Sequence, residues 1–234
     1  MTERQRAALA WLRELRRVPC MDCGRTLAPH VMDFDHRDPK MKSFSLTTGK
    51  AYLKNRAVLE AEIAKCDVVC GNCHRIRTGA QYASGELAYG FTPSLTEDAT
   101  PRQLKKRAEY VRRRREQMEL VNRIRSLPCA CCGESFPICA MEFDHREASQ
   151  KMGTVCFMAG RVGIRKLLEE IAKCDIVCTN CHRDRSFQRR AQRGCGVVAA
   201  HDPSKVETRV RFPPPAPDQL RLIEESRAPY RYAA

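Results

Sequence analysis

The sequence predicts an α+β fold made of two tandem small domains, each stabilised by zinc and each preceded by a basic amphipathic helix. Three observations lead to this prediction: a segment that occurs twice, four Cys-x-x-Cys pairs, and a helical segment rich in Lys and Arg before each copy. The chain beyond the second copy repeats nothing and contains the run FPPPAP, which cannot form regular packed structure. We therefore expect a disordered C-terminal tail.

The duplication covers two motifs. Residues 32–37, MDFDHR, return as residues 141–146, MEFDHR, and residues 62–75, EIAKCDVVCGNCHR, return as residues 170–183, EIAKCDIVCTNCHR. In a chain of 234 residues, two copies at offsets of 109 and 108 residues fit tandem domains better than a solenoid, whose repeats are shorter and more numerous. We place the domains at 1–92 and 102–193, the linker at 93–101 and the tail at 194–234.

Hydrophobic spacing predicts the elements of the first copy. Ala8, Trp11, Leu12 and Leu15 share one face of a basic helix that Pro19 ends. Further on we expect a strand over 31–36, a helix over 57–65, a strand over 67–70 and a helix from Asn72, an acceptable N-cap residue.

The second copy is preceded by a longer basic helix over residues 102–125, with ten Lys or Arg against three Glu. Its run from Arg112 to Arg115 either follows a phosphate backbone or forms a solvated helix face, and the sequence supports both readings equally.

Composition narrows the class of protein. Fourteen Cys, with no hydrophobic signal sequence and no apolar run long enough for a membrane span, favour a reducing cytoplasm in which paired thiols bind metal; disulfides are the less favoured alternative. A net charge of +14 favours nucleic acid as the partner, although a merely soluble basic protein has the same property. We expect no membrane association and no requirement for an oligomer.

The spacing of the cysteines predicts two structural zinc ions. Each copy supplies two close pairs of thiols, as a tetrahedral structural zinc site requires. Cys131 lies beside Cys132, but the repeat offset selects Cys132. The expected ligands are Cys20, Cys23, Cys70 and Cys73 in the first copy, and Cys129, Cys132, Cys178 and Cys181 in the second.

Zinc does not account for the repeated Asp35-His36 pair or for His74. A carboxylate beside an imidazole, with a second imidazole next to a zinc ligand, forms a set that can hold a divalent cation and activate water. Cys73 and His74 lie about 100° apart on a helix, so one can face the zinc and the other a separate site. The alternative is that Asp35 merely orients His36 and that His74 caps or hydrogen-bonds locally.

The order Cys-x-x-Cys, Asp-His, Cys-x-x-Cys-His resembles the zinc-stabilised branch of the HNH endonucleases, whose fold is the ββα-metal finger. The resemblance covers residues 19–78 and 128–186. It implies that the Asp-His pair lies on a first strand, that residues 67–70 form the second strand, and that a helix from Asn72 crosses them.

By this resemblance, His36 and His145 would be general bases that deprotonate the attacking water. Asp35 with His74, and Asp144 with His182, would hold a catalytic divalent cation, Mg²⁺ or Mn²⁺. Candidate nucleic-acid contacts are Arg37, Arg75, Arg146 and Arg183.

One departure from the family is shared by both copies. The middle Asn of the family pattern is replaced by Lys65 and Lys173, and Asn72 and Asn180 stand too late in the sequence to be equivalent. Because both copies share the change, it is typical of a subfamily variant.

The sequence therefore predicts a metal-dependent endonuclease acting on double-stranded DNA. Two other classes stay open: a double zinc-finger protein that binds nucleic acid without catalysis, and a zinc module for protein interaction. The first leaves the repeated Asp-His pair and His74 and His182 unexplained, and the second leaves the charge unexplained.

Overall fold

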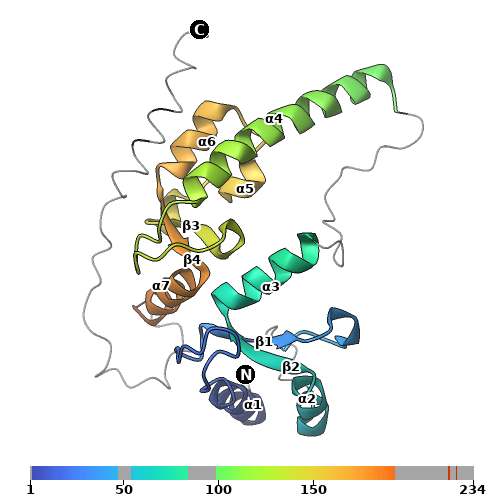
Figure 1. Cartoon of the computed structure of the whole chain (residues 1–234), viewed down its shortest axis with the longest axis vertical. Coiled ribbons are helices and arrows are strands. Elements are labelled where there is room, and N and C mark those ends of the chain that lie inside the picture. Colours follow the sequence, from blue (N-terminus) through green and yellow to red (C-terminus); the bar gives the residue numbers. More distant parts are fainter. Residues whose placement is uncertain (1, 47–53, 84–98, 193–220, 222–224, 226–234) are drawn as a thin grey trace. The chain divides into compact units, whose positions relative to one another are not determined.

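The computed structural model describes residues 2–46, 54–83 and 99–192 together with positions 221 and 225 (Figure 1). Within these residues the predicted α+β class is confirmed, with seven α-helices and two two-stranded sheets. Most of the expected disordered tail and most of the linker fall outside the described residues. Arg221 and Glu225, which lie in the tail, have helical backbone and form an ion pair. None of the described helices is long and apolar enough to cross a membrane.

The described residues form two compact units. The first holds residues 2–46, 54–80 and 183–192, and the second holds residues 81–83 and 99–182 with positions 221 and 225. The proposed domain boundaries stay a prediction, because residues 84–98 lie outside the described part of the chain.

The first unit contains a short antiparallel sheet with three helices. Its elements are α1 (Glu3–Glu14), β1 (Met32–His36), η1 (Pro39–Met41), α2 (Arg56–Ile63), β2 (Cys66–Cys70) and α3 (Gly71–Ala83). Thr2 and Gln5 close a capping box that starts α1, and the Asn55 side chain accepts a hydrogen bond from Val58 N at the start of α2. Helix α3 begins one residue before the expected Asn72, which lies buried in its first turn.

Side chains on the two faces of β1 have different surroundings. Strand β1 pairs with β2 so that Asp35 lies opposite Asp67 and His36 opposite Cys66. Alternation along the strand sends Asp33 and Asp35 to the face that contacts His74 of α3. Phe34 points to the other face and packs with Leu12 of α1 and Leu59 of α2.

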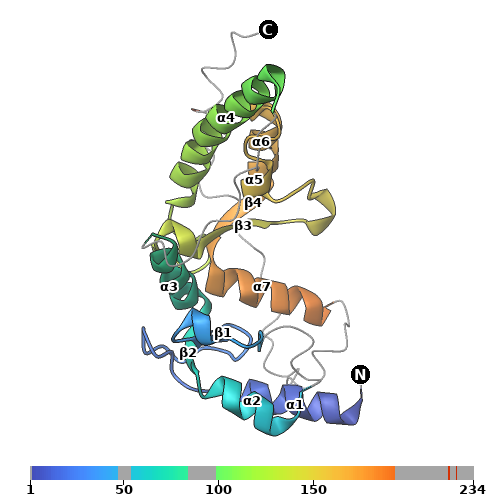
Figure 2. The ribbon, with the colours of Figure 1, turned by 90° about the vertical axis from the view of Figure 1, so that its right-hand side faces the viewer.

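The second unit repeats this plan. Its elements, the last of which continues into the first unit, are α4 (Pro101–Arg125), η3 (Ile138–Ala140), β3 (Met141–His145), η4 (Ala148–Gln150), α5 (Val155–Met158), α6 (Ile164–Ile171), β4 (Cys174–Cys178) and α7 (Thr179–Gln192). Figures 1 and 2 show α4 lying along α5 and α6. Leu120, Val121 and Ile124 of α4 join Leu167 and Ile171 of α6 in the core.

Half of the basic run on α4 has a structural role. Arg113 Nε donates to Gly160 O at 2.9 Å, and Arg114 Nη1 donates to Ala159 O at 2.8 Å, so both guanidinium groups bind carbonyls just after α5. Arg112 pairs with Glu116 on the surface. The hypothesis that this run contacts a phosphate backbone therefore stays a prediction for Arg112 and Arg115 only.

We expect Gly160→Ala to detach α4 from α5. Gly160 has φ +83°, and an added Cβ would lie 2.6 Å from Arg114 Cβ. Backbone strain and this contact together should lower the free energy of unfolding by about 2 kcal/mol, as measured by urea denaturation.

The matched control is Gly163→Ala, since a Cβ there meets nothing within 4 Å. It should cost less than about 1 kcal/mol. Equal losses in the two variants would contradict the close packing of α4 on Gly160.

Candidate metal centre and its polar surroundings

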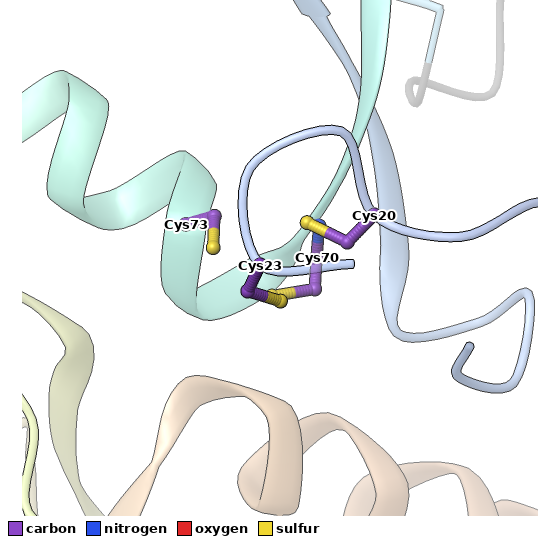
Figure 3. A group of neighbouring side chains, drawn as sticks. All are labelled: Cys20, Cys23, Cys70 and Cys73. Atoms are coloured by element: carbon purple, nitrogen blue, oxygen red, sulfur yellow. The ribbon is translucent and has the colours of Figure 1, made fainter. Parts of the chain in front are cut away.

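The first cluster of thiols lies where β2 passes into α3. Cys20 and Cys23 come from the loop after α1, Cys70 ends β2 and Cys73 lies in the first turn of α3 (Figure 3). The four Sγ atoms lie within 4.8 Å of one another, and Cys23 Sγ is 3.9 Å from Cys70 Sγ. A tetrahedral zinc with 2.3 Å bonds to sulfur needs about 3.8 Å between ligands. The cluster therefore fits a structural zinc ion.

Backbone amides favour the thiolate form of Cys20 in this cluster. Cys70 N donates to Cys20 Sγ at 3.2 Å. Burial raises the pKa of Cys20, but backbone N–H donors at Cys23, Cys70 and Asp22 outweigh burial and lower the pKa to about 7. Because zinc binds thiolates, this environment prepares the site for the metal.

The second cluster repeats the first, with Cys129, Cys132, Cys178 and Cys181 within the same distance. Cys178 N donates to Cys129 Sγ at 3.2 Å. Gly24 and Gly133 follow the first Cys pair of each copy with φ +68° and +73°, a conformation that glycine adopts without strain. The predicted choice of Cys132 is confirmed, and no other group of three or more metal-ligating side chains is found among the described residues.

His74 lies between two carboxylates of β1. Its Nδ1 is 2.8 Å from Asp33 Oδ2, and its Nε2 is 3.4 Å from Asp35 Oδ1. Burial raises the pKa of Asp33, but the hydrogen bond with His74 and nearby positive charge outweigh burial and keep the pKa low. A carboxylate can only accept, so Nδ1 of His74 donates to Asp33 while Nε2 faces the carboxylate of Asp35.

The second copy has the same arrangement. His182 Nδ1 bonds to Glu142, the counterpart of Asp33, and His182 Nε2 lies 3.5 Å from Asp144 Oδ1. A carboxylate that orients a metal-binding imidazole is a common second layer around metal ions. In each copy the structure thus brings together the predicted Asp and His ligands and adds an orienting acid.

His36 contacts a buried carboxylate on α2. His36 Nε2 lies 2.8 Å from Glu62 Oε1, and in the second copy His145 Nε2 lies 2.8 Å from Glu170 Oε1. The side chains of Glu62 and Glu170 are 2 % and 0 % exposed. The two predicted general bases therefore have a partner that the sequence analysis did not name.

Arg77 ties the acidic residues together. Its Nη1 lies 3.2 Å from Asp35 Oδ2 and 3.0 Å from Asp67 Oδ2, while its Nε donates to Asp22 at 2.9 Å. The guanidinium therefore fixes the carboxylate of Asp35 with its second oxygen directed at His74.

The arginines chosen as nucleic-acid contacts differ in their surroundings. Arg37 Nη1 donates to Cys66 O and Asp67, and Arg146 Nη1 donates to Cys174 O and Asp175, so both link the end of one strand to its partner. Arg75 is exposed on α3, whereas Arg183 is partly exposed and its Nη1 forms an ion pair with Asp33 Oδ2 at 2.7 Å. Their contacts with nucleic acid stay a prediction.

The sequence analysis did not identify three kinds of residue near the site. These are the acid that contacts the second histidine (Asp33 and Glu142), the buried glutamate (Glu62 and Glu170) and Arg77. Repetition was an available signal for all three. Glu62 and Glu170 stand at matching positions, Arg77 returns as Arg185, and Asp33 and Glu142 precede the Asp that is the predicted metal ligand by two residues, on the same strand face.

Comparisons of the chain with protein-family models, with curated proteins and with solved structures find no match.

We expect the purified chain to bind two zinc ions, one at each cluster of thiols. Cys73→Ser and Cys181→Ser should each lower the zinc content by about one ion and destabilise the copy that contains the change. Elemental analysis and thermal unfolding measure these effects.

Cys139→Ser is the matched control, because Cys139 is partly buried but belongs to neither cluster. An unchanged zinc content in either cluster variant would contradict that cluster as a zinc site.

Proposed function

We propose that this chain is a metal-dependent endonuclease that hydrolyses phosphodiester bonds in DNA, with one reaction centre in each copy. The observation that carries the proposal is the repeated Asp-His pair beside a carboxylate-oriented histidine. Nε2 of His74 and of His182 faces an Asp carboxylate at 3.4 and 3.5 Å in the two copies.

The donor set fits a hard divalent cation. Mg²⁺ is commonly bound by one or two carboxylates and completes its coordination with water and substrate phosphate oxygens, whereas imidazole is a ligand typical of transition-metal ions. Asp35 and His74 would provide such a small set, because the hydrogen bond from His74 Nδ1 to Asp33 directs Nε2 towards Asp35, and a neutral imidazole would coordinate a cation there through Nε2. When bound, the cation would neutralise charge on the phosphate and stabilise the leaving 3′-oxygen.

His36 is suited to accept the proton of the attacking water. A neutral imidazole accepts a proton near pH 7, and His36 adjoins Asp35 at the end of β1. The two side chains leave opposite faces of the strand, because Asp35 contacts α3 and His36 contacts α2. We therefore assign cation binding and proton transfer to separate side chains.

The charge of the chain supports a polyanionic substrate. The net charge of +14 is accompanied by exposed cations on α1 and α4, among them Arg4, Arg6, Arg102, Lys105 and Lys106. Such positive surface attracts the phosphate backbone of nucleic acid independently of its base sequence.

The proposal predicts that the chain cuts supercoiled plasmid DNA when Mg²⁺ or Mn²⁺ is present and stops when EDTA is added. His36→Ala with His145→Ala should lower the rate by at least about 100-fold, since general bases contribute at least that much. With His145→Ala alone, the first copy should still nick the plasmid, and the formation of linear plasmid should be slower. Agarose-gel quantification of the three plasmid forms measures this.

A chain that binds DNA at low salt but cuts with neither cation would be a non-catalytic zinc-stabilised binding protein. If His145→Ala changes neither nicking nor linearisation, two reaction centres are not both in use. Glu14→Gln, an exposed change that only breaks a pair with Arg17, serves as the control and should cut like the unsubstituted chain.

Asp33→Asn should weaken the cation site without removing a ligand. An amide at position 33 no longer forces His74 Nδ1 to donate, so the imidazole loses its fixed orientation. The Mn²⁺ concentration for half-maximal cleavage should rise by about 10- to 100-fold. An unchanged Mn²⁺ requirement would contradict the orienting role of Asp33.

A further inference from the structure

The two buried glutamates have the same set of partners in both copies. Glu62 Oε1 accepts from Ser43 N at 2.7 Å and Phe44 N at 3.3 Å, and its Oε2 accepts from Lys65 Nζ at 2.7 Å. The fourth partner is His36 Nε2. Each carboxylate oxygen is therefore engaged, and of these four partners the imidazole alone could either donate or accept.

The second copy repeats these contacts position by position. Glu170 Oε1 accepts from Met152 N at 2.7 Å and Gly153 N at 3.1 Å, and Oε2 accepts from Lys173 Nζ at 2.7 Å. Two independent copies with different loop residues keep the same network. This recurrence indicates that both histidines require a carboxylate held in a fixed position.

The lysines occupy the positions where the HNH pattern has its middle Asn. Lys65 Nζ also donates to Met41 O at 3.2 Å and Ser43 Oγ at 3.0 Å, and Lys173 Nζ donates to Gln150 O at 3.1 Å. Each lysine thus joins the buried carboxylate to the loop that follows the Asp-His strand. Although Lys replaces the Asn of the HNH pattern, the side chain at this position still makes polar contacts with the loop.

The ionisation of the glutamate decides which nitrogen of the histidine carries the proton. Burial raises the pKa of Glu170, but hydrogen bonds from Lys173, His145 and the two N–H groups outweigh burial and lower the pKa to about 2. The same causes lower the pKa of Glu62. An ionised carboxylate only accepts, so Nε2 of the histidine must donate, and in the neutral imidazole Nδ1 then carries the lone pair.

We infer that Glu62 and Glu170 are positioning residues that hold His36 and His145 as the Nε2–H tautomer, so that Nδ1 is the proton acceptor. Lys65 and Lys173 fix the orientation of these carboxylates. The inference rests on the proposed function, because it assigns an atom of each histidine to the proton transfer.

The test uses the full chain with the proposed general base of the second copy removed. In the His145→Ala background, Glu62→Gln keeps the size of the side chain but lets the amide donate as well as accept. We expect kcat for plasmid nicking to fall by about 100-fold while KM changes by less than about threefold, as for loss of an aligned base. Two bound zinc ions per chain should remain, which shows that the fold is kept.

Nitrogen-15 NMR of the histidine ring gives a readout that a purely structural role would not change. The His36 signals, identified by their absence in His36→Ala, should show the Nε2–H tautomer in the parent and a mixture in Glu62→Gln. The matched control is Glu60→Gln, which lies on the same helix and only loses a surface pair with Arg56. It should change neither kcat nor the tautomer.

Unchanged kcat or an unchanged tautomer in Glu62→Gln would overturn the inference. If Glu62→Gln loses zinc, the same comparison is made with Glu170→Gln in the His36→Ala background, with Glu169→Gln as its control. If the unsubstituted chain cuts no DNA, the proposed function fails. The tautomer measurement then decides separately whether the glutamate holds the histidine.

Discussion

The convergence of four thiols at the junction of β2 and α3 is the constraint on which the first unit depends. Cys70 ends the strand and Cys73 lies in the first turn of the helix, so a bound metal fixes the direction in which α3 leaves the sheet. His74 follows Cys73 by about 100° around the helix and thereby reaches β1. The site geometry is a consequence of the cysteine cluster, since the small apolar core alone offers little to orient α3.

The strand that carries the Asp-His pair separates two polar networks. On one face, carboxylates at alternate positions of β1 orient His74 and present Asp35 to it. On the other face, His36 meets a carboxylate held by a lysine and two backbone amides. Both networks satisfy their buried polar groups, which low-dielectric surroundings require. One dipeptide thus supplies two side chains with independent supports.

Comparison of the copies distinguishes required features from adaptable ones. The thiols, the Asp-His pair, the second histidine and the Glu-Lys pair keep their contacts in both. The orienting acid changes from Asp33 to Glu142, and Asp22, which binds Arg77, is replaced by Cys131. In the second copy α4 and α5 contribute to a larger core. The unchanged features are those that the proposed reaction uses.

The sequence by itself determined the α+β class, the strands and helices around each motif, and the two sets of four cysteines. These follow from local patterns, because hydrophobic spacing and Cys-x-x-Cys pairs act over a few residues. The separation of Cys73 from His74 on α3 also followed from helical geometry. The resemblance to the HNH pattern supplied the roles of Asp35 and His36, which no local pattern contains.

Only the tertiary structure decided what holds those side chains. Glu62 reaches His36 across 26 residues of chain, and Asp33 reaches His74 across 41. Nothing in the local spacing of these residues encodes such contacts, because they arise when α2 and α3 pack on opposite faces of β1. In the sequence, Lys65 is only a departure from the HNH pattern. In the structure, its Nζ donates to the Glu62 carboxylate that contacts His36.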